Sequence, residues 1–146
     1  MNANRILCPV DFSEASNRAL DLASKLAREA DAKLYIVHVE ENAAVTHPGL
    51  FGGLPPAISS DKRRLNNTLP TATEVTFEHD MLVGNPVDEI IEFAKQNHID
   101  LIVMGSHGLT GVARVLLGSV AEAVVRKSPV PVLTLKTTSK ELSAVE

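Results

Sequence analysis

Short apolar runs alternate along the chain with longer segments in which apolar residues recur at helical spacing. Strands are predicted at 5–10, 33–40, 74–82, 99–105 and 129–136, and helices at 13–30, 60–69, 86–98 and 119–128. Most of these strands are apolar nearly throughout, which is typical of strands with helices on both faces, whereas the third alternates and is expected to be less buried. Strands that alternate with helices predict an α/β fold built on one open, five-stranded parallel sheet.

The helical segments carry apolar faces that would cover such a sheet. The inward residues are expected to be Ala15, Ala19, Leu22, Ala23, Leu26, Ala27 and Ala30 in the first helix, Val87, Ile90, Ile91 and Ala94 in the third, and Val120, Ala121, Val124 and Val125 in the last. Ser13 or Asp11 can cap the first helix, and Pro86 suits the first position of the third.

Two segments fall outside this alternation. Residues 41–60 are rich in proline and glycine and are predicted to form a flexible loop, which is either a lid over a site or simply disordered. Residues 137–146 are predicted to be a polar tail. No linker or internal repeat divides the chain, so a single domain spanning 1–146 is expected.

Composition and charge narrow the class of partner. Of the 146 residues 3% are aromatic, and the formal net charge is −4, so neither base stacking nor a basic face favours nucleic acid. No apolar run reaches transmembrane length and MNANRILCPV has no secretory pattern, so a cytoplasmic protein without a membrane partner is expected. Cys8 is the one cysteine; it is expected to be inert core and fits a reducing compartment.

A ligand site is expected at the carboxyl ends of two strands. In open parallel sheets, ligands bind beyond these ends, at the point where the strand order reverses. The first strand is followed by PVDFS and the fourth by VMGSHGLTG, and both continuations are unusual. If the two strands are neighbours, Asp11 and Gly105 face the same crevice.

The stretch GSHGLTGVARVLLGSV admits two interpretations. In the first, Gly105 turns the chain sharply off the strand with a positive φ, and Gly108 and Gly118 let a phosphate approach the main chain; the helix that begins near Ser119 would offer free N–H groups and a partial positive charge. Alternatively, the glycines simply end a strand and open a loop, and Ser119 and Glu122 form a capping box. The stretch is neither a Walker A sequence nor the dinucleotide fingerprint.

The glycine spacing resembles that of the nucleotide-binding members of the universal stress protein family. Gly105, two residues, Gly108, nine residues, Gly118 and Ser119 match that pattern, and ILCPVDFSEAS and SPVPVLTLK resemble the family's first and last strands. The resemblance covers essentially the whole chain. It implies a Rossmann-like fold of the adenine nucleotide alpha hydrolase type, with helices on both faces and strand order 3-2-1-4-5.

The resemblance also implies the ligand and its contacts. ATP, or ADP or AMP, would bind with Mg²⁺ or Mn²⁺ bridged through its phosphates and with no protein metal cluster. Asp11 would accept hydrogen bonds from the ribose, Met104 would lie beside it, and Pro9, Val10 and Val39 would line the adenine; the phosphates would be surrounded by Gly105, His107, Gly108, Gly118, Ser119 and Val120.

Several of these residues have plainer alternatives. Asp11 could only cap the first helix, His107 could be a solvated loop residue, and Val39 and Met104 could be ordinary core. Arg114 could reach a phosphate or lie on the surface. The remaining histidines show no metal-ligand spacing; they are His38, His47, His79 and His98.

Three functions compete at this point. The first is an ATP-binding regulatory protein of the stress response, the second a slow ATPase or phosphotransferase, and the third a dimerisation module with a vestigial site. Asp11 and His107 are the only candidates near the phosphates for orienting a water molecule, and the glycine stretch holds no lysine, so little or no hydrolysis is expected and no catalytic residue is assigned. The family implies a homodimer through the last strand, Val130 to Leu135.

Overall fold

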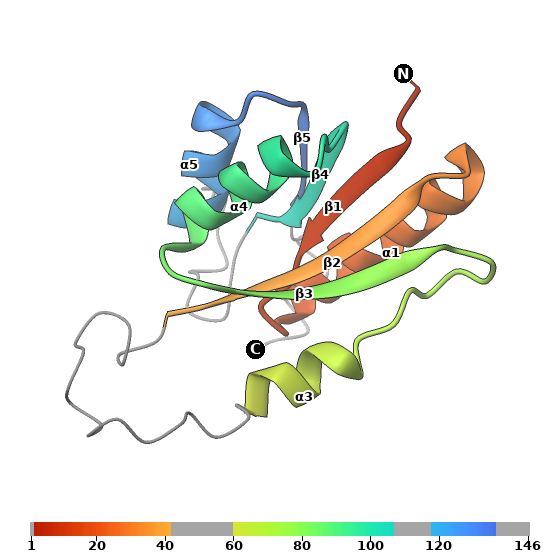
Figure 1. Cartoon of the computed structure of the whole chain (residues 1–146), viewed down its shortest axis with the longest axis horizontal. Helices are drawn as coiled ribbons and strands as arrows, with labels where there is room; N and C mark the ends of the chain where they lie inside the picture. Colours follow the sequence, from red (N-terminus) through yellow and green to blue (C-terminus); the bar gives the residue numbers. More distant parts are fainter. Residues whose placement is uncertain (1, 42–59, 107–117, 137–146) are drawn as a thin grey trace.

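The computed structural model describes residues 2–41, 60–106 and 118–136, which form a five-stranded sheet with helices packed on it (Figure 1). The strands are β1 (Arg5–Pro9), β2 (Lys33–Glu40), β3 (Phe77–Val83), β4 (Leu101–Gly105) and β5 (Val132–Leu135), and the helices are α1 (Glu14–Ala30), α3 (Ser60–Asn66), α4 (Pro86–Gln96) and α5 (Ser119–Lys127). All neighbouring strands are parallel, in the order β3-β2-β1-β4-β5. The predicted fold class and strand order are confirmed.

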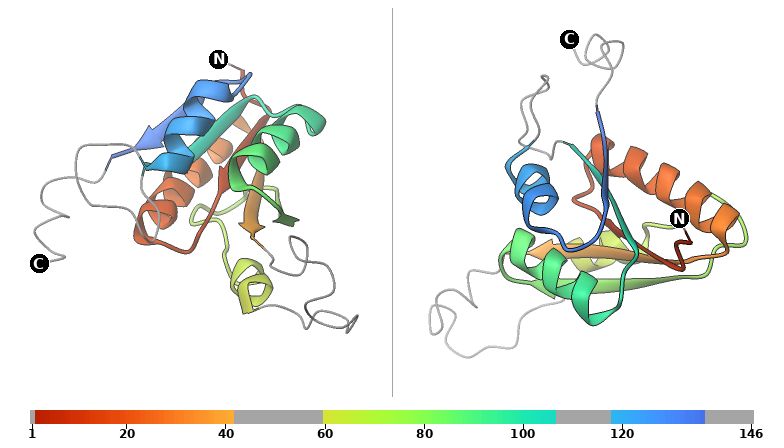
Figure 2. Two further views of the ribbon diagram at one scale, coloured as in Figure 1. Left: turned by 90° about the vertical axis from the view of Figure 1, so that its left-hand side faces the viewer. Right: turned by 90° about the horizontal axis from the view of Figure 1, so that it is seen from above.

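Each face of the sheet has its own hydrophobic core. On one face α1 and Leu65 of α3 pack on the sheet, and on the other face Ile90 of α4 and Val124 of α5 do so. Because side chains alternate across a strand, the neighbours Ile36 and Val37 of β2 lie in different cores. Figure 2 shows α1 on one side of the sheet and α4 and α5 on the other. This layering leaves the carboxyl ends of the strands uncovered by these helices.

Helices α1 and α4 begin at side-chain caps. The Ser13 hydroxyl accepts a hydrogen bond from the Ser16 N–H at 3.2 Å, and Asn85 caps α4 in the same way, ahead of Pro86. A cap of this kind stabilises a helix by about 1 kcal/mol. Of the two candidates for α1, Ser13 is therefore the cap, and Asp11 lies outside the helix.

Several predicted boundaries and two predicted burials are corrected. β3 begins at Phe77 rather than at residue 74, because its pairing with β2 starts there, and α3 ends at Asn66 rather than at residue 69. Val125 is 45% exposed, so the prediction that it faces inward is wrong; α5 buries only a narrow stripe against the sheet. The same prediction is wrong for Ala30, which is exposed at the last turn of α1. Ser60 already belongs to α3, and the rest of the predicted 41–60 loop after residue 41 lies outside the described residues, as does the 137–146 tail.

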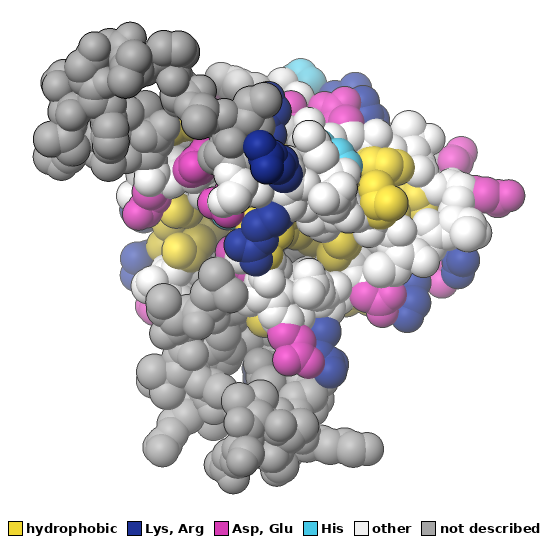
Figure 3. Space-filling view, turned by 90° about the horizontal axis from the view of Figure 1, so that it is seen from below, with side chains coloured by type: hydrophobic (Ala, Val, Ile, Leu, Met, Phe, Trp, Pro, Cys, Tyr) yellow, Lys and Arg dark blue, Asp and Glu magenta, His cyan; other side chains and the backbone are white. Residues whose placement is uncertain are grey.

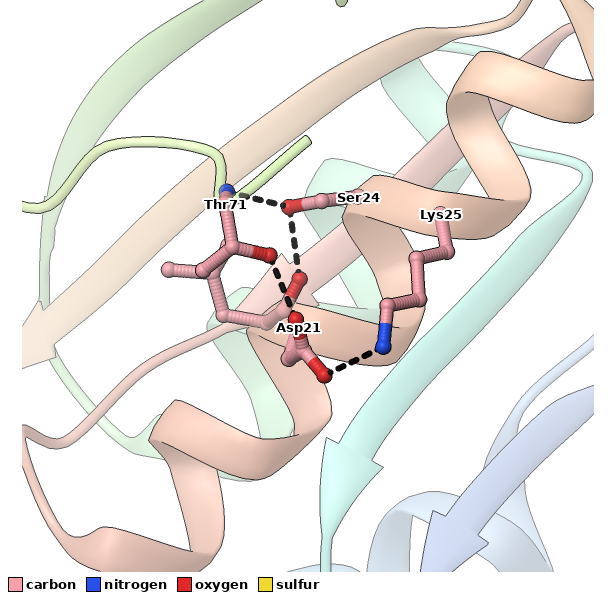
Figure 4. A network of polar contacts seen from close by, with 5 residues as sticks. Asp21, Ser24, Lys25 and Thr71 are labelled. Atoms are coloured by element: carbon pink, nitrogen blue, oxygen red, sulfur yellow. Dashed lines mark hydrogen bonds and ion pairs between the residues drawn. The ribbon is translucent and has the colours of Figure 1, made fainter. Parts of the chain in front are cut away.

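A polar network ties the segment after α3 to α1 (Figure 4). Asp21 accepts a hydrogen bond from the Thr71 hydroxyl at 2.7 Å and pairs with Lys25 at 2.9 Å. The Ser24 hydroxyl oxygen accepts from the Thr71 N–H at 3.2 Å. The hydrogen bond from Thr71 is the main cause that lowers the pKa of Asp21. The chain between α3 and β3 is thereby fastened to the helix that covers the same face.

Candidate functional site

The strand order reverses between β1 and β4. These two strands are neighbours, with Ile6 opposite Leu101 and Leu7 opposite Ile102. β1 continues into α1 on one face, whereas α5, the next helix after β4, lies on the other face, so the chain diverges at their carboxyl ends. Such a divergence forms the crevice in which open parallel sheets bind ligands. The expectation that the first and fourth strands are neighbours is confirmed.

Asp11 lies in the turn between β1 and α1 and is half-buried. Its Oδ1 atom accepts hydrogen bonds from both the N–H, at 3.0 Å, and the hydroxyl of Ser13. Its own N–H donates to the Ser16 hydroxyl oxygen at 3.3 Å. Within the described part of the chain, Oδ2 accepts no hydrogen bond, so one carboxylate oxygen is held in place by the turn while the other can accept from a ligand.

Pro9 and Val10 precede Asp11 at the carboxyl end of β1. Val10 is 4% exposed, with its side chain in the core under α1, and its N–H donates to the Val37 carbonyl at 2.8 Å. The Val10 carbonyl accepts from His38 Nδ1 at 2.7 Å. Pro9 ends β1 and is half-buried. Val10 is thus fixed through both backbone groups, and its side chain is turned into the core.

Val39 and Met104 are both placed by the core on the α4 and α5 face. Val39, next to last in β2, is half-buried and packs against that core. Met104 is 6% exposed and belongs to the core itself. The burial of Met104 agrees with the plainer alternative of an ordinary core residue. Contact of either residue with adenine or ribose stays a prediction.

Gly105 ends β4 in close contact with α1. A Cβ atom at this position would lie 2.8 Å from the backbone carbonyl carbon of Ala15 and 2.9 Å from its oxygen. The φ angle of Gly105 is not in the left-handed region, so the prediction of a positive φ there is wrong. The reason for glycine is the close approach of two backbones, which places the end of β4 against the start of α1.

The start of α5 is held beside the end of β4. The Gly118 N–H donates to the carbonyl of Ser106, and the Ser106 N–H donates to the Leu135 carbonyl of β5 at 3.0 Å. Ser106 itself is 1% exposed. Residues 107–117, which include His107, Gly108, Gly111 and Arg114, lie outside the described residues.

Glycine occupies the N-cap position of α5. Gly118 is the N-cap residue, Ser119 is the first helical residue, and among the described residues no side chain caps the helix. The capping-box alternative is therefore wrong, because Ser119 lies one position too late, and Glu122 instead pairs with Arg126 at 3.9 Å. The first N–H groups of a helix have no partner within it. Those of Ser119 and Val120 can therefore bind an anion at the edge of the crevice.

A group of side chains without any distinguishing sequence pattern surrounds the Asp11 turn. Phe12 has a φ of 66°, and its ring contacts His38 of β2 and Arg64 of α3. His38 also faces Asp61, with Nε2 and Oδ2 3.4 Å apart. The positive φ of a phenylalanine gives no signal in the sequence, and α3 lies some fifty residues further along the chain.

The described residues show no reactive cysteine, no protein metal site and no membrane-spanning helix. Cys8 is fully buried, and burial raises the pKa of its thiol to about 12, which confirms an unreactive core residue. In the ranges 2–41, 60–106 and 118–136, no three potential ligand side chains gather around a metal position. None of the helices there combines the length and the apolar character needed to cross a bilayer.

Sequence comparison places the chain among known proteins. The sequence model of the Universal stress protein family matches residues 2–136. Universal stress protein MJ0531 of Methanocaldococcus jannaschii is 37% identical, over 94% of this chain and 84% of its own length. Universal stress protein YxiE of Bacillus subtilis is 34% identical, over 91% of this chain and 99% of its own length.

Solved structures agree with the sequence comparison. The universal stress protein UspA from Lactobacillus plantarum superposes with a TM-score of 0.75 at 27% identity, covering 93% of this chain and 99% of its own. A universal stress protein in complex with cAMP gives 0.69 at 31% identity, over 94% and 100% of the two chains. A universal stress protein from Archaeoglobus fulgidus in complex with dAMP gives 0.64 at 25% identity, over 93% and 100%.

Proposed function

The chain belongs to the universal stress protein family, and on that premise we propose that it binds an adenine nucleotide, with ATP as the main candidate, at the carboxyl ends of β1 and β4. Two of the solved relatives hold adenine nucleotides, cAMP and dAMP, which supports this ligand class. We further propose a cytoplasmic regulatory role in the stress response, in which the protein holds the nucleotide and hydrolyses it slowly or not at all.

One observation carries the proposal: the uncapped N-terminus of α5 lies against the end of β4, at the crevice next to the Asp11 turn. The Gly118 hydrogen bond to Ser106 fixes the helix start, and the contact of Gly105 with Ala15 fixes the end of β4 against α1. Helix N-termini attract phosphate through unpaired N–H groups and the helix dipole. A carboxylate and an anion site at one edge suit a sugar phosphate.

Each part of the nucleotide would then have its own contacts. The Oδ2 atom of Asp11 would accept from the ribose hydroxyls. The N–H groups of Ser119 and Val120 would face the phosphates, beside Gly105, Gly118 and the segment of His107 and Gly108. Pro9, Val10, Val39 and Met104 would border the base and sugar. Mg²⁺ or Mn²⁺ would be held through phosphate oxygens.

The absence of lysine from residues 105–120 favours holding over cleavage. Phosphoryl transfer needs charge stabilisation on the transferred group and a residue that positions the nucleophile. In this stretch Arg114 is the one side chain with a permanent positive charge, and His107 and the nearby Asp11 are the candidates for positioning water. A slow ATPase is therefore the second candidate function.

Bound small molecules test the proposal. Protein purified without added nucleotide is denatured, and the released compounds are identified by mass spectrometry; an adenine nucleotide in near-stoichiometric amount is the expected result. Release of no adenine nucleotide, together with no binding of added ATP, ADP or AMP, would favour the vestigial module. Phosphate release from ATP faster than about one per minute would favour the enzyme.

A further inference from the structure

A left-handed backbone conformation marks the residue after Asp11. Phe12 has a φ of 66°, an unfavourable backbone conformation for a bulky side chain. A conformation of this kind persists only where surrounding contacts hold it, and it is found most often near binding sites. The contacts that hold Phe12 therefore bear on where Asp11 points.

The Phe12 ring is held by side chains from two other elements. The His38 ring of β2 lies 4.6 Å away between centroids, tilted by 41°. The guanidinium carbon of Arg64 lies 4.3 Å from the centroid of the Phe12 ring, a cation–π distance. Arg64 is half-exposed and belongs to α3, so the helix reaches back over the β1–α1 turn through this side chain.

His38 connects the other side of Asp11 to the same helix. Its Nδ1 lies 2.7 Å from the Val10 carbonyl oxygen, which can only accept, so this nitrogen is the donor. Its Nε2 lies 3.4 Å from Oδ2 of Asp61 in α3, and Asp61 Oδ1 in turn lies 3.7 Å from Arg64. Phe12 is thus tied to α3 through Arg64, and Val10 is tied to it through His38 when the ring is protonated and Nε2 also donates.

Helix α3 is itself anchored to the core and to α1. Leu65 is 1% exposed in the core that it shares with α1, and Thr71, just beyond the helix, is bonded to Asp21 and Ser24. On the face seen in Figure 3, basic side chains lie near the centre of the view with acidic side chains beside them, in keeping with the ion pairs of α3. The helix can therefore act as a fixed support for the turn.

We propose that α3 positions Asp11 for the sugar of the nucleotide, with Arg64 as a positioning residue that acts through Phe12. The inference rests on the proposed function, since it concerns the same site. Without the guanidinium, the strained Phe12 conformation loses one of its two ring partners, and the turn visits other conformations. Asp11 then spends less time in the binding geometry, and the apparent affinity falls by that fraction.

Calorimetric titrations with two ligands separate positioning from general support. Mg-ATP and Mg-2′,3′-dideoxy-ATP, which lacks the hydroxyls that Asp11 would bind, are titrated into wild type and into Arg64→Met. The variant is expected to bind ATP about three- to fivefold more weakly, the worth of one cation–π contact, and to bind the dideoxy ligand as wild type does. Arg64→Lys, which keeps a cation, should recover part of the loss.

Two further variants complete the design. Arg63→Met removes the same charge from an exposed neighbouring position of α3 and is expected to leave both affinities unchanged. Asp11→Asn should show the same selective loss for ATP, and Arg64→Met should add nothing to it, because both changes act on one contact.

The outcomes distinguish this inference from the proposed function. An unchanged ATP affinity in Arg64→Met, or an equal loss for both ligands, would overturn the positioning role while wild-type binding of ATP still supports the proposed function. A wild-type protein that binds neither ligand would overturn both.

Discussion

At Gly105 a hydrogen atom stands where a Cβ atom would lie 2.8 Å from the carbonyl carbon of Ala15. The motif glycine therefore has a packing reason that does not depend on any ligand. Gly118, in contrast, has an extended conformation, with φ −63° and ψ 157°, that other residues adopt readily. Both glycines belong to the same spacing pattern. Packing requires glycine at 105, whereas glycine at 118 is explained by the phosphate that we propose binds beside it.

Gly105→Ala is expected to destabilise the fold by about 1–3 kcal/mol, because the added methyl group forces two backbones apart. Urea unfolding followed by circular dichroism measures the change. Adding Ala15→Gly should recover little, since two of the three atoms met by the new Cβ are backbone. Unchanged stability in Gly105→Ala would show that the contact relaxes at no cost.

At this scale the sequence predicts residues whose spacing repeats a known pattern, and it misses those set by tertiary contact. Gly118 follows from the glycine spacing, and Asp11 from the resemblance of the ILCPVDFSEAS segment to the family's first strand. The left-handed Phe12 does not, because the conformation is imposed by His38 and by Arg64, fifty-two positions away in the sequence. Contact between such distant residues depends on the strand order, which the sequence pattern alone leaves open.

Among the elements, β3 combines an edge position with a buried charge. Asp80 Oδ2 is buried and has no hydrogen-bond partner among the described residues. Burial is the main cause that raises the pKa of Asp80 to about 6, with Glu78 on the same strand adding to it. The Glu78 pKa is lowered by its hydrogen bond with Lys33, whose Nζ lies 2.6 Å away. The pKa values of the two carboxyl groups on this strand are thus shifted in opposite directions.

Asp80→Asn is expected to stabilise the protein at pH 7.5 by about 1 kcal/mol or less, allowing for solvent screening. Between the ordinary pKa of 3.8 and the raised value of about 6, the folded chain binds the proton more tightly than the unfolded chain. Wild-type stability contributed by Asp80 therefore falls as the pH rises through this window, and the asparagine variant escapes that loss.

Thermal unfolding at pH 7.5 and pH 4 measures the difference in stability between Asp80→Asn and wild type. This difference in stability should shrink at pH 4, where Asp80 of the folded wild type is largely protonated. Glu29→Gln, an exposed position on α1, is the control and should show no such trend. A difference of equal size at both pH values would mean that the buried carboxyl is not its source.

Helices and buried strands were predictable as elements because their apolar spacing is strong, whereas several of their ends were not. The start of α5 shifts by one residue relative to a capping box, since Gly118 is placed by its hydrogen bond to Ser106. The start of β3 is set by pairing with β2 rather than by its own alternation. The ends of these elements depend on hydrogen-bond partners elsewhere in the chain, which a local sequence pattern does not identify.

At the scale of the whole molecule, both edge strands of the sheet carry an exposed apolar side chain, but only β5 is immediately preceded by proline. β5 is one edge strand, with Leu133 38% exposed and prolines at 129 and 131 that remove backbone donors. β3 is the other edge, where Phe77 is also 38% exposed. A homodimer through β5 and a single domain over the whole chain stay predictions.

Leu133→Lys should convert such a dimer to a monomer, because it places a charge in the apolar part of the proposed interface. Size-exclusion chromatography with light scattering gives the mass at micromolar concentration. Phe77→Lys is the matched control on the opposite edge and should remain a dimer. A monomeric wild type would remove the dimer from the account, and a dimeric Leu133→Lys would place the interface elsewhere.

The central claim is that the edge formed by β1, β4 and the start of α5 holds an adenine nucleotide. Its most direct test is calorimetric titration of Mg-ATP into wild type, Gly118→Ala and Gly118→Val, each checked for folding by circular dichroism. Wild type should bind, and the valine variant should bind about tenfold more weakly than the alanine variant, because its branched side chain blocks the approach of a phosphate to the N–H groups of α5. Equal affinity of the alanine and valine variants, or no heat from wild type up to about 1 mM ATP, would contradict the claim.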